Sequence, residues 1–260
     1  MFVKVMTVMK YDAMIFDLYG TLVDNFEGAA YRRVVHMQAD IFGIDRLAFW
    51  NAWTNEAIRA RRFAGAYASF EENLQDVCRL VGARYDRARL SLALEVRMQC
   101  TRENLLPREG VIETLQLLRA TGHKIGLISD CAWETPEVFA GTDMAPLMDA
   151  AVFSCIEKLK KPDERLYRLA AERLGVAADR CLYVADGNSN ELAGARNVGM
   201  DAVLMCAPHE EHIVMARPEP KAWTSARIAA IPDVLRLASP AAVTERSWRS
   251  DAAVAAREAV

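Results

Sequence analysis

The 260-residue chain is long enough for one large domain, or for one domain that carries an insert. It is 52% hydrophobic and 26% charged, as ordinary globular proteins are, and its net charge of −3 argues against a general nucleic-acid binder. Six scattered cysteines without a Cys-x-x-Cys pair suggest reduced thiols of a cytoplasmic protein. The apolar start, residues 1–10, is too short to cross a bilayer and lacks a cleavage site, so we expect no membrane partner.

Residues 14–16 (Met-Ile-Phe) form a short apolar run that predicts the end of a buried parallel strand. Asp17 then stands at the carboxyl end of that strand, where open α/β sheets bind ligands. Gly20 permits a sharp turn just after it, and Thr21 brings a hydroxyl close to the carboxylate. The plainer interpretation is an aspartate that caps a loop.

Residues 25–105 lose the strand signals, and apolar side chains recur at helical spacing instead. This pattern predicts an all-helical insert of four or five helices. Three of its arginines, Arg59, Arg61 and Arg62, could contact an anionic substrate, although a solvated helix face is the plainer interpretation. The periodic apolar positions include Tyr31, Val34, Val35, Ile41, Phe49, Trp50, Trp53, Phe70, Leu74, Val77 and Cys78.

After Pro107 and Gly110 the pattern alternates between helices and strands. Such alternation predicts an α/β fold with a parallel sheet and right-handed crossovers. The expected helices are 111–120, 164–174 and 191–198, and the expected strands are 124–129, 150–154, 180–185 and 201–205. One further helix is expected within 223–237, and residues 239–260 are expected to be a tail.

Three of the predicted strands end in polar residues, namely Asp17, Ser129 and Asp186. The carboxyl ends of parallel strands share one edge of a sheet, so these side chains should form one site. Taken singly, Ser129 is also compatible with a strand-end cap, and Asp186 with a plain turn.

The stretch Asp17-Leu-Tyr19-Gly-Thr21 resembles the first motif of the haloacid dehalogenase (HAD) superfamily of hydrolases and phosphotransferases. The resemblance implies that Asp17 is a covalent nucleophile. The second aspartate of the motif, the general acid of most phosphatases of the family, is replaced here by Tyr19. It also implies a Rossmann-like core of residues 1–24 and 106–238, with 25–105 as a helical C1-type cap domain.

Three later segments resemble the other motifs of the family. Ser129 matches a hydroxyl that, with the Asp130 backbone N–H, would bind oxygens of the transferred group. Lys161, in Lys-Pro-Asp, would balance the carboxylates, although a solvated basic turn is the alternative. Asp186 matches an acidic Mg²⁺ ligand, and Asn190 and Glu191 match positions that bind or orient the metal.

Two carboxylates at one site repel each other unless a cation lies between them, so Asp17 and Asp186 favour a hard cation such as Mg²⁺. In the family a backbone carbonyl supplies the third protein ligand, and Tyr19 holds that position. The predicted catalytic residues are Asp17, Tyr19, Thr21, Ser129 and Lys161. The predicted substrate-binding residues are Ser129, Asp130 and Lys161, and the predicted metal ligands are Asp17, Tyr19 and Asp186.

These residues favour an Mg²⁺-dependent hydrolase that cleaves a small phosphorylated metabolite through an aspartyl-phosphate. Tyr19 instead fits the 2-haloacid dehalogenase branch, whose aspartate attacks carbon without a metal. That branch, however, has serine and asparagine where this chain has Asp186, and a cap arginine where it has Trp50-Asn51. A catalytically weak relative kept as a binding protein is the third alternative.

The remaining expectations concern partners and two local motifs. We expect a small, anionic substrate, no nucleic acid, and a monomer or homodimer. Residues 209–212 (His-Glu-Glu-His) lack the spacing of a zinc helix and are interpreted as a surface loop. Cys131 could line the site, but no histidine accompanies it, so a thiol nucleophile is not expected.

Overall fold

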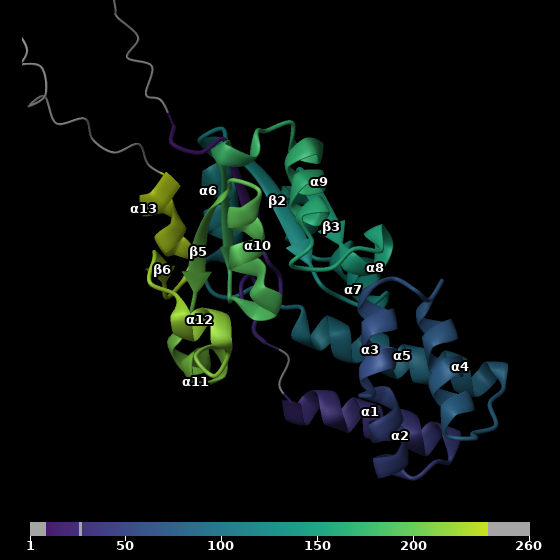
Figure 1. The fold of residues 1–260 in the computed structure, drawn as a ribbon. Helices are drawn as coiled ribbons and strands as arrows, with labels where there is room; N and C mark the ends of the chain where they lie inside the picture. Colours follow the sequence, from purple (N-terminus) through teal and green to yellow (C-terminus); the bar gives the residue numbers. More distant parts are fainter. Residues whose placement is uncertain (1–8, 26–27, 239–260) are drawn as a thin grey trace, which may run out of the picture.

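A six-stranded parallel sheet forms the centre of the larger domain in the computed structural model, which describes residues 9–25 and 28–238 (Figure 1). The strand order is β3-β2-β1-β4-β5-β6, so β1 lies inside the sheet between β2 and β4. This confirms the predicted α/β core. The strands are β1 (Ala13–Phe16), β2 (Lys124–Ser129), β3 (Ala150–Phe153), β4 (Cys181–Ala185), β5 (Asp201–Met205) and β6 (Arg227–Ile228).

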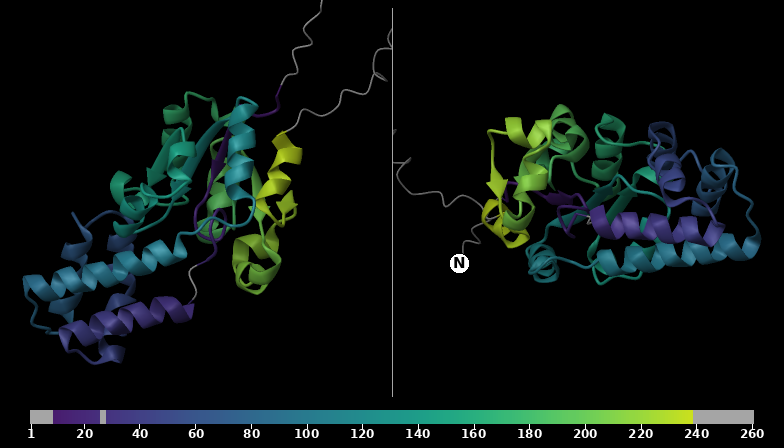
Figure 2. Two further views of the ribbon diagram at one scale, coloured as in Figure 1. Left: turned by 180° about the vertical axis from the view of Figure 1, so that it is seen from behind. Right: turned by 90° about the horizontal axis from the view of Figure 1, so that it is seen from below.

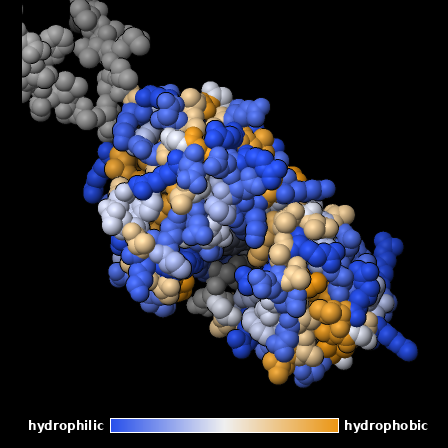
Figure 3. Space-filling model, in the orientation of Figure 1, coloured by the Kyte–Doolittle hydropathy of each residue, from blue (hydrophilic) through white to orange (hydrophobic). Residues whose placement is uncertain are grey.

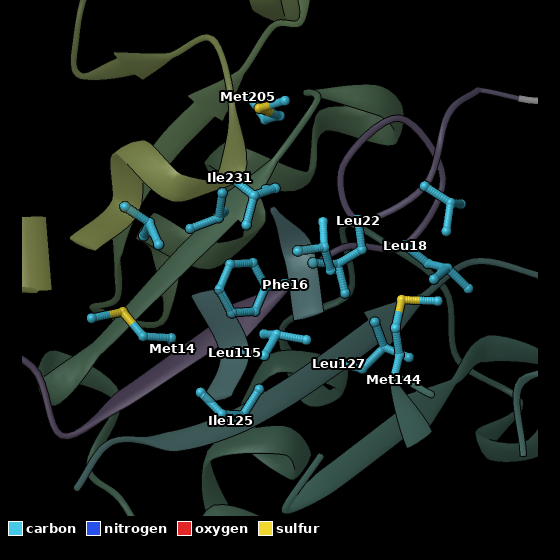
Figure 4. Packing of buried hydrophobic residues seen from close by; sticks show 14 of the residues in the cluster. Met14, Phe16, Leu18, Leu22, Leu115, Ile125, Leu127, Met144, Met205 and Ile231 are labelled. Atoms are coloured by element: carbon cyan, nitrogen blue, oxygen red, sulfur yellow. The ribbon is translucent and has the colours of Figure 1, made fainter. Parts of the chain in front are cut away.

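Helices cover both faces of this sheet (Figures 1 and 2). Buried side chains of α6 (Val111–Ala120) and α13 (Val234–Ala238) pack against one face, and those of α9 (Glu164–Leu174) and α10 (Glu191–Asn197) against the other. Residues of β1 alternate between the two layers: Met14 and Phe16 belong to the first cluster, which Figure 4 shows, and Ile15 to the second. A strand buried on both faces has to be apolar throughout, which explains its run of apolar residues.

Five helices form a smaller domain beside the sheet, as the sequence predicts for the insert (Figure 1). Four begin at a polar side chain that accepts a backbone N–H, the usual way of satisfying the free donors of a first turn. Helices α1 and α5 run side by side in both views of Figure 2. The five are α1 (Gly28–Phe42), α2 (Arg46–Trp53), α3 (Glu56–Phe63), α4 (Phe70–Leu80) and α5 (Arg87–Asn104).

The helical domain has a hydrophobic cluster of its own, to which all five helices contribute. Two connecting segments join it to the sheet domain, and they contact each other. Val23 forms an isolated antiparallel bridge with Pro107, and the backbone N–H of Arg108 donates to the carbonyl of Leu22 at 2.9 Å. The chain therefore leaves the sheet domain and returns to it at one place.

The region after β5 differs from the sequence-based prediction. In place of one helix within 223–237, the chain forms β6 and then α13, because Arg227 and Ile228 pair with the edge of β5. Two residues are too few to show a strand pattern in a sequence. The predicted tail, 239–260, lies outside the described residues. Short helices complete the chain: α7 (Glu134–Phe139), α8 (Ser154–Glu157), α11 (Glu211–Val214) and α12 (Pro218–Ala222).

The interpretation of residues 209–212 as a surface loop is wrong in part, since His209, Glu211 and His212 are exposed but the segment is not a loop. They lie in two short helical turns, and Glu210 is buried. Its carboxylate accepts the backbone N–H of Asn25 at 2.6 Å and pairs with Arg108. The Arg108 guanidinium compensates the buried charge of Glu210, and the sequence alone does not reveal this pairing.

Within the described ranges, no helix has the length and apolarity that crossing a membrane requires.

Candidate active site

Asp17 follows β1 directly and is 6% exposed. Lys161 Nζ donates to its Oδ1 at 2.5 Å, and Thr21 Oγ1 donates to its Oδ2 at 3.2 Å. Burial raises the pKa of the Asp17 carboxyl, and the Lys161 ammonium opposes that rise. The predicted nucleophile is therefore a buried carboxylate held by a cation and a hydroxyl.

Lys161 lies between two acids. Besides Asp17, its Nζ donates to Glu191 Oε2 at 2.5 Å, and Tyr183 OH donates to the same oxygen at 2.7 Å. Burial by itself would lower the pKa of Lys161, but the two carboxylates raise that pKa well above its ordinary value. The lysine is thus a permanent cation, and Glu191 fixes its position.

Asp186 follows β4 and is fully buried. Its Oδ1 accepts the backbone N–H of Asn188 at 3.1 Å, as in an ordinary turn. Its Oδ2 accepts Arg217 Nη1 at 2.5 Å and Asn25 Nδ2 at 3.3 Å. The carboxylate also lies against the turn after β1, where a Cβ on Gly20 would come within 2.1 Å of Oδ2. Only glycine fits there, so the first and fourth motifs are in close contact.

Asp17, Asp186 and Glu191 each offer one oxygen, and these three oxygens lie within 4.8 Å of one another. Such a cluster is what a divalent cation needs, but the oxygens are already bound. Arg217 holds Oδ2 of Asp186, while Lys161 and the Asn188 backbone hold the two oxygens of Glu191. As arranged here, an ion that bound Oδ2 of Asp186 would have to displace the guanidinium of Arg217.

Ser129 and Asp130 lie where the sequence predicts them, at the carboxyl end of β2. Ser129 is buried, and its Oγ has no hydrogen-bond partner among the described residues. Asp130 Oδ1 accepts the backbone N–H of Lys161 at 3.0 Å, which ties the second motif to the third. The fold thus brings Asp17, Ser129, Lys161 and Asp186 to one edge of the sheet.

The Tyr19 hydroxyl reaches α7, where it lies 3.2 Å from Thr135 Oγ1. Burial raises the pKa of this phenol above its ordinary value. A phenol with a raised pKa is a poor general acid at neutral pH.

A cavity of about 800 Å³ lies between the sheet domain and the helical domain. Figure 3 shows the surface hollowed between the two. A second cavity of about 40 Å³ is lined by Asp17 and Lys161, and the two cavities share Tyr19, Asp130 and Asn188 in their walls. Asp17, the predicted nucleophile, therefore lines a narrow pocket that adjoins a wide one.

Comparison with known proteins fits this geometry. A family profile described as haloacid dehalogenase-like hydrolase matches residues 11–199, which include every motif residue described above. The chain belongs to the haloacid dehalogenase-like hydrolases. As a member of this family it is an enzyme, a hydrolase with a Rossmann-like core.

Two curated relatives of this HAD hydrolase have different activities. An (S)-2-haloacid dehalogenase of Pseudomonas fluorescens is 29% identical over 193 residues, which cover 71% of this chain and 80% of the relative. A glyceraldehyde 3-phosphate phosphatase of Methanocaldococcus jannaschii is 24% identical over 137 residues, 52% of this chain and 60% of the relative. The L-2-haloacid dehalogenase of Xanthobacter autotrophicus has the same fold, with a TM-score of 0.58, 20% identity, and coverage of 87% and 98% of the two chains.

Sequence reasoning missed two contributors to the site of this HAD hydrolase. Arg217 lies after α11, outside any family motif, and no pattern in the sequence points to it. Tyr183 lies inside β4, where it looks like an ordinary apolar strand residue, although its hydroxyl binds Glu191. Asn190, predicted to assist a metal, has no side-chain hydrogen bond at its helix start, and Asn188 contacts the acids instead.

Proposed function

We propose that this HAD hydrolase attacks carbon, through Asp17 and without a metal ion, in a 2-substituted carboxylic acid such as a 2-haloacid. The observation that carries the proposal is the ion pair of Arg217 with Asp186. Three buried carboxylates are met by the two cations Lys161 and Arg217, so no positive charge is left over to receive a phosphate dianion. A monoanionic acid needs less positive charge from the site than a phosphate dianion does.

Tyr19 supports the same conclusion. A phosphate ester with an alkyl leaving group needs a proton donor, and the buried phenol with its raised pKa is poorly suited to that task. A halide leaves as a stable anion and needs no proton. The relative from Pseudomonas fluorescens, a 2-haloacid dehalogenase that matches 71% of the chain, provides independent support.

In the proposed reaction a carboxylate oxygen of Asp17 forms a bond to C2 of the acid, and the C2–halogen bond breaks with its electron pair on the halide. Water then attacks the carbonyl carbon of the resulting aspartyl ester. The acyl–oxygen bond breaks, one proton of the water passes to the leaving oxygen and the other to solvent, so a 2-hydroxy acid leaves and the Asp17 carboxylate is restored. Lys161 would hold Asp17 in place, and Lys161 and Ser129 could stabilise charge on the ester oxygen.

A second candidate is the Mg²⁺-dependent phosphatase predicted from the sequence. The three acidic oxygens within 4.8 Å support it, as does the phosphatase relative from Methanocaldococcus jannaschii. It requires Arg217 to leave Asp186 if the ion binds Oδ2, the oxygen that the guanidinium holds.

A hydrolysis screen separates the two candidates. Short 2-haloacids and phosphate esters are tested side by side, each with Mg²⁺ and with EDTA, on the wild type and on Asp17→Asn. We expect halide release that EDTA does not reduce and that Asp17→Asn lowers at least about a thousandfold. Release of phosphate that EDTA abolishes, without halide release, would reject the lead in favour of the phosphatase.

A further inference from the structure

The wide cavity is larger than a short 2-haloacid requires. Its volume of about 800 Å³ falls in the range of about 300–1,000 Å³ that is typical of pockets for much larger organic ligands. Part of its wall is aromatic, with Tyr31, Trp50 and Phe63 from the helical domain. A short acid at Asp17 would leave most of this space to water.

The wall contributed by the helical domain is also cationic. Arg59 and Arg62 of α3 both line the cavity, because they are three residues apart and so share one face of the helix. Arg32 of α1 joins them while its guanidinium stacks on Trp50 at 4.7 Å. Arg61, between the two arginines of α3, points away and pairs with Asp76 at 2.5 Å. The sequence does not show which of these arginines line the cavity, whereas their positions on α3 do.

Arg62 is the best evidence for a ligand at this wall. It is 2% exposed, with its guanidinium 3.7 Å above the ring of Trp53. Nε donates to Asn73 at 2.7 Å and Nη2 to the carbonyl of Trp53 at 3.0 Å. Nη1 is buried and has no partner within the described part of the chain. A buried guanidinium that lacks both a carboxylate and a partner for one nitrogen is costly unless something else binds it.

The charges around Arg62 point to an anion. A second buried arginine, Arg97, donates from Nε to Glu134 Oε1 at 2.9 Å, so this buried carboxylate is paired with Arg97 and not with Arg62. Burial lowers the pKa of Arg62 to about 10, which leaves the side chain charged at neutral pH. Glu134 Oε2 has no partner among the described residues and lines the same cavity, so a bound molecule could also donate a hydrogen bond there.

We propose that Arg59 and Arg62 form a subsite for a second anionic group, and that the substrate is a long organic acid with an aromatic or apolar middle and a distal carboxylate. One end would lie at Asp17 and the other at α3, with the middle part against Trp50 and Phe63. The inference rests on the proposed function only in placing the reacting end at Asp17. A forked guanidinium suits a carboxylate better than it suits a neutral group.

Binding of two unreactive probes tests this subsite without any turnover. Hydrocinnamate and its para-carboxy derivative differ only in the distal carboxylate, and calorimetry gives the Kd of each. We expect wild type to bind the dicarboxylate at least about tenfold more tightly. In Arg59→Gln and in Arg62→Gln this preference should fall to less than about threefold. Arg61→Gln, which removes the same charge from the same helix, should keep it.

Equal affinity of both probes for wild type would overturn the proposal, and so would an equal loss of preference in Arg61→Gln. If Arg62→Gln does not fold, Arg59→Gln and Arg62→Lys decide, because lysine keeps the charge but loses the fork. Failure of the proposed function looks different: no 2-haloacid would be hydrolysed, yet the dicarboxylate preference and its dependence on Arg59 would persist.

Discussion

Arg217 Nη1 lies 2.5 Å from Oδ2 of Asp186, a carboxylate that has no exposure to solvent. The sequence predicts a magnesium ion for this carboxylate, and the structure gives it a guanidinium from a distant part of the chain. Asn25 joins the two, since its amide donates to Asp186 and accepts from Arg217 Nη2 at 3.2 Å. The pair is thus held by a third side chain from the segment that leads to the helical domain.

We expect Arg217→Gln to bind Mg²⁺ at least about tenfold more tightly than wild type, because it frees Oδ2 and removes a positive charge. Without Mg²⁺ the variant should lose about 3 kcal/mol of unfolding free energy, since a buried carboxylate loses its cation. Calorimetry and urea unfolding, each with and without Mg²⁺, measure both effects. Arg196→Gln is the control, as Arg196 is exposed and bonds Ser225. Mg²⁺ binding that is equally tight in wild type would contradict our assignment of Arg217.

Lys161→Met should be the most destabilising change at the site. It leaves Asp17 and Glu191 buried and facing each other without the ammonium that joins them. We expect a loss of about 3–5 kcal/mol in unfolding free energy, as for other broken buried ion pairs. Urea denaturation provides the value, with the exposed Lys160→Met as the matched control. A difference of less than about 1 kcal/mol between the two variants would mean that the pair contributes little.

Tyr19→Phe should change kcat for a 2-haloacid by less than about threefold, because a halide leaves without a proton. The ring stays packed, and the contact of the hydroxyl with Thr135 is lost. That loss should cost about 1 kcal/mol of stability. Initial rates of halide release and thermal unfolding are the measurements. A fall in kcat of a hundredfold or more would mean that the phenol takes part in the reaction. It would count against a leaving group that, like halide, departs without a proton.

His123 should make stability depend on pH. The residue is buried, and burial lowers its pKa below the ordinary 6.5. The unfolded chain therefore takes up a proton more readily than the folded one, so stability is complete above about pH 6.5 and decreases as the pH falls below it. In His123→Gln this decrease should be smaller. Urea midpoints from pH 7.5 to 5 for both proteins test the point, and parallel curves would exclude His123 as the cause.

The sheet and the motif residues could be predicted because their signals are local. Residues 14–16 are apolar since β1 is covered on both faces, and Asp17, Ser129 and Asp186 follow strands whose ends share one edge. Helices such as 111–120 and 164–174 also agree with the structure, because their apolar spacing reports the face that they bury.

What could not be predicted depends on partners that are distant in the sequence. Arg217 acts on Asp186 only because the chain after β5 folds back over the strand ends. Glu210 lies in a polar tetrapeptide, and its burial depends on Arg108 and Asn25, which are distant in the sequence. Arg59, Arg61 and Arg62 look alike in sequence, and the turn of α3 decides which of them line the cavity. Long-range pairing of charges carries no periodic signal.

The bridge between Val23 and Pro107 has a consequence for how such an enzyme diversifies. Since the two connections meet, the helical domain is attached to the sheet domain in the way that a surface loop is attached, however many residues it contains. The entropy of closing a loop grows only slowly with its length, so an insert of another size would cost the sheet domain little extra stability. Recombination at these two points could therefore exchange the part of the cavity wall that the helical domain contributes and leave the residues around Asp17 in place.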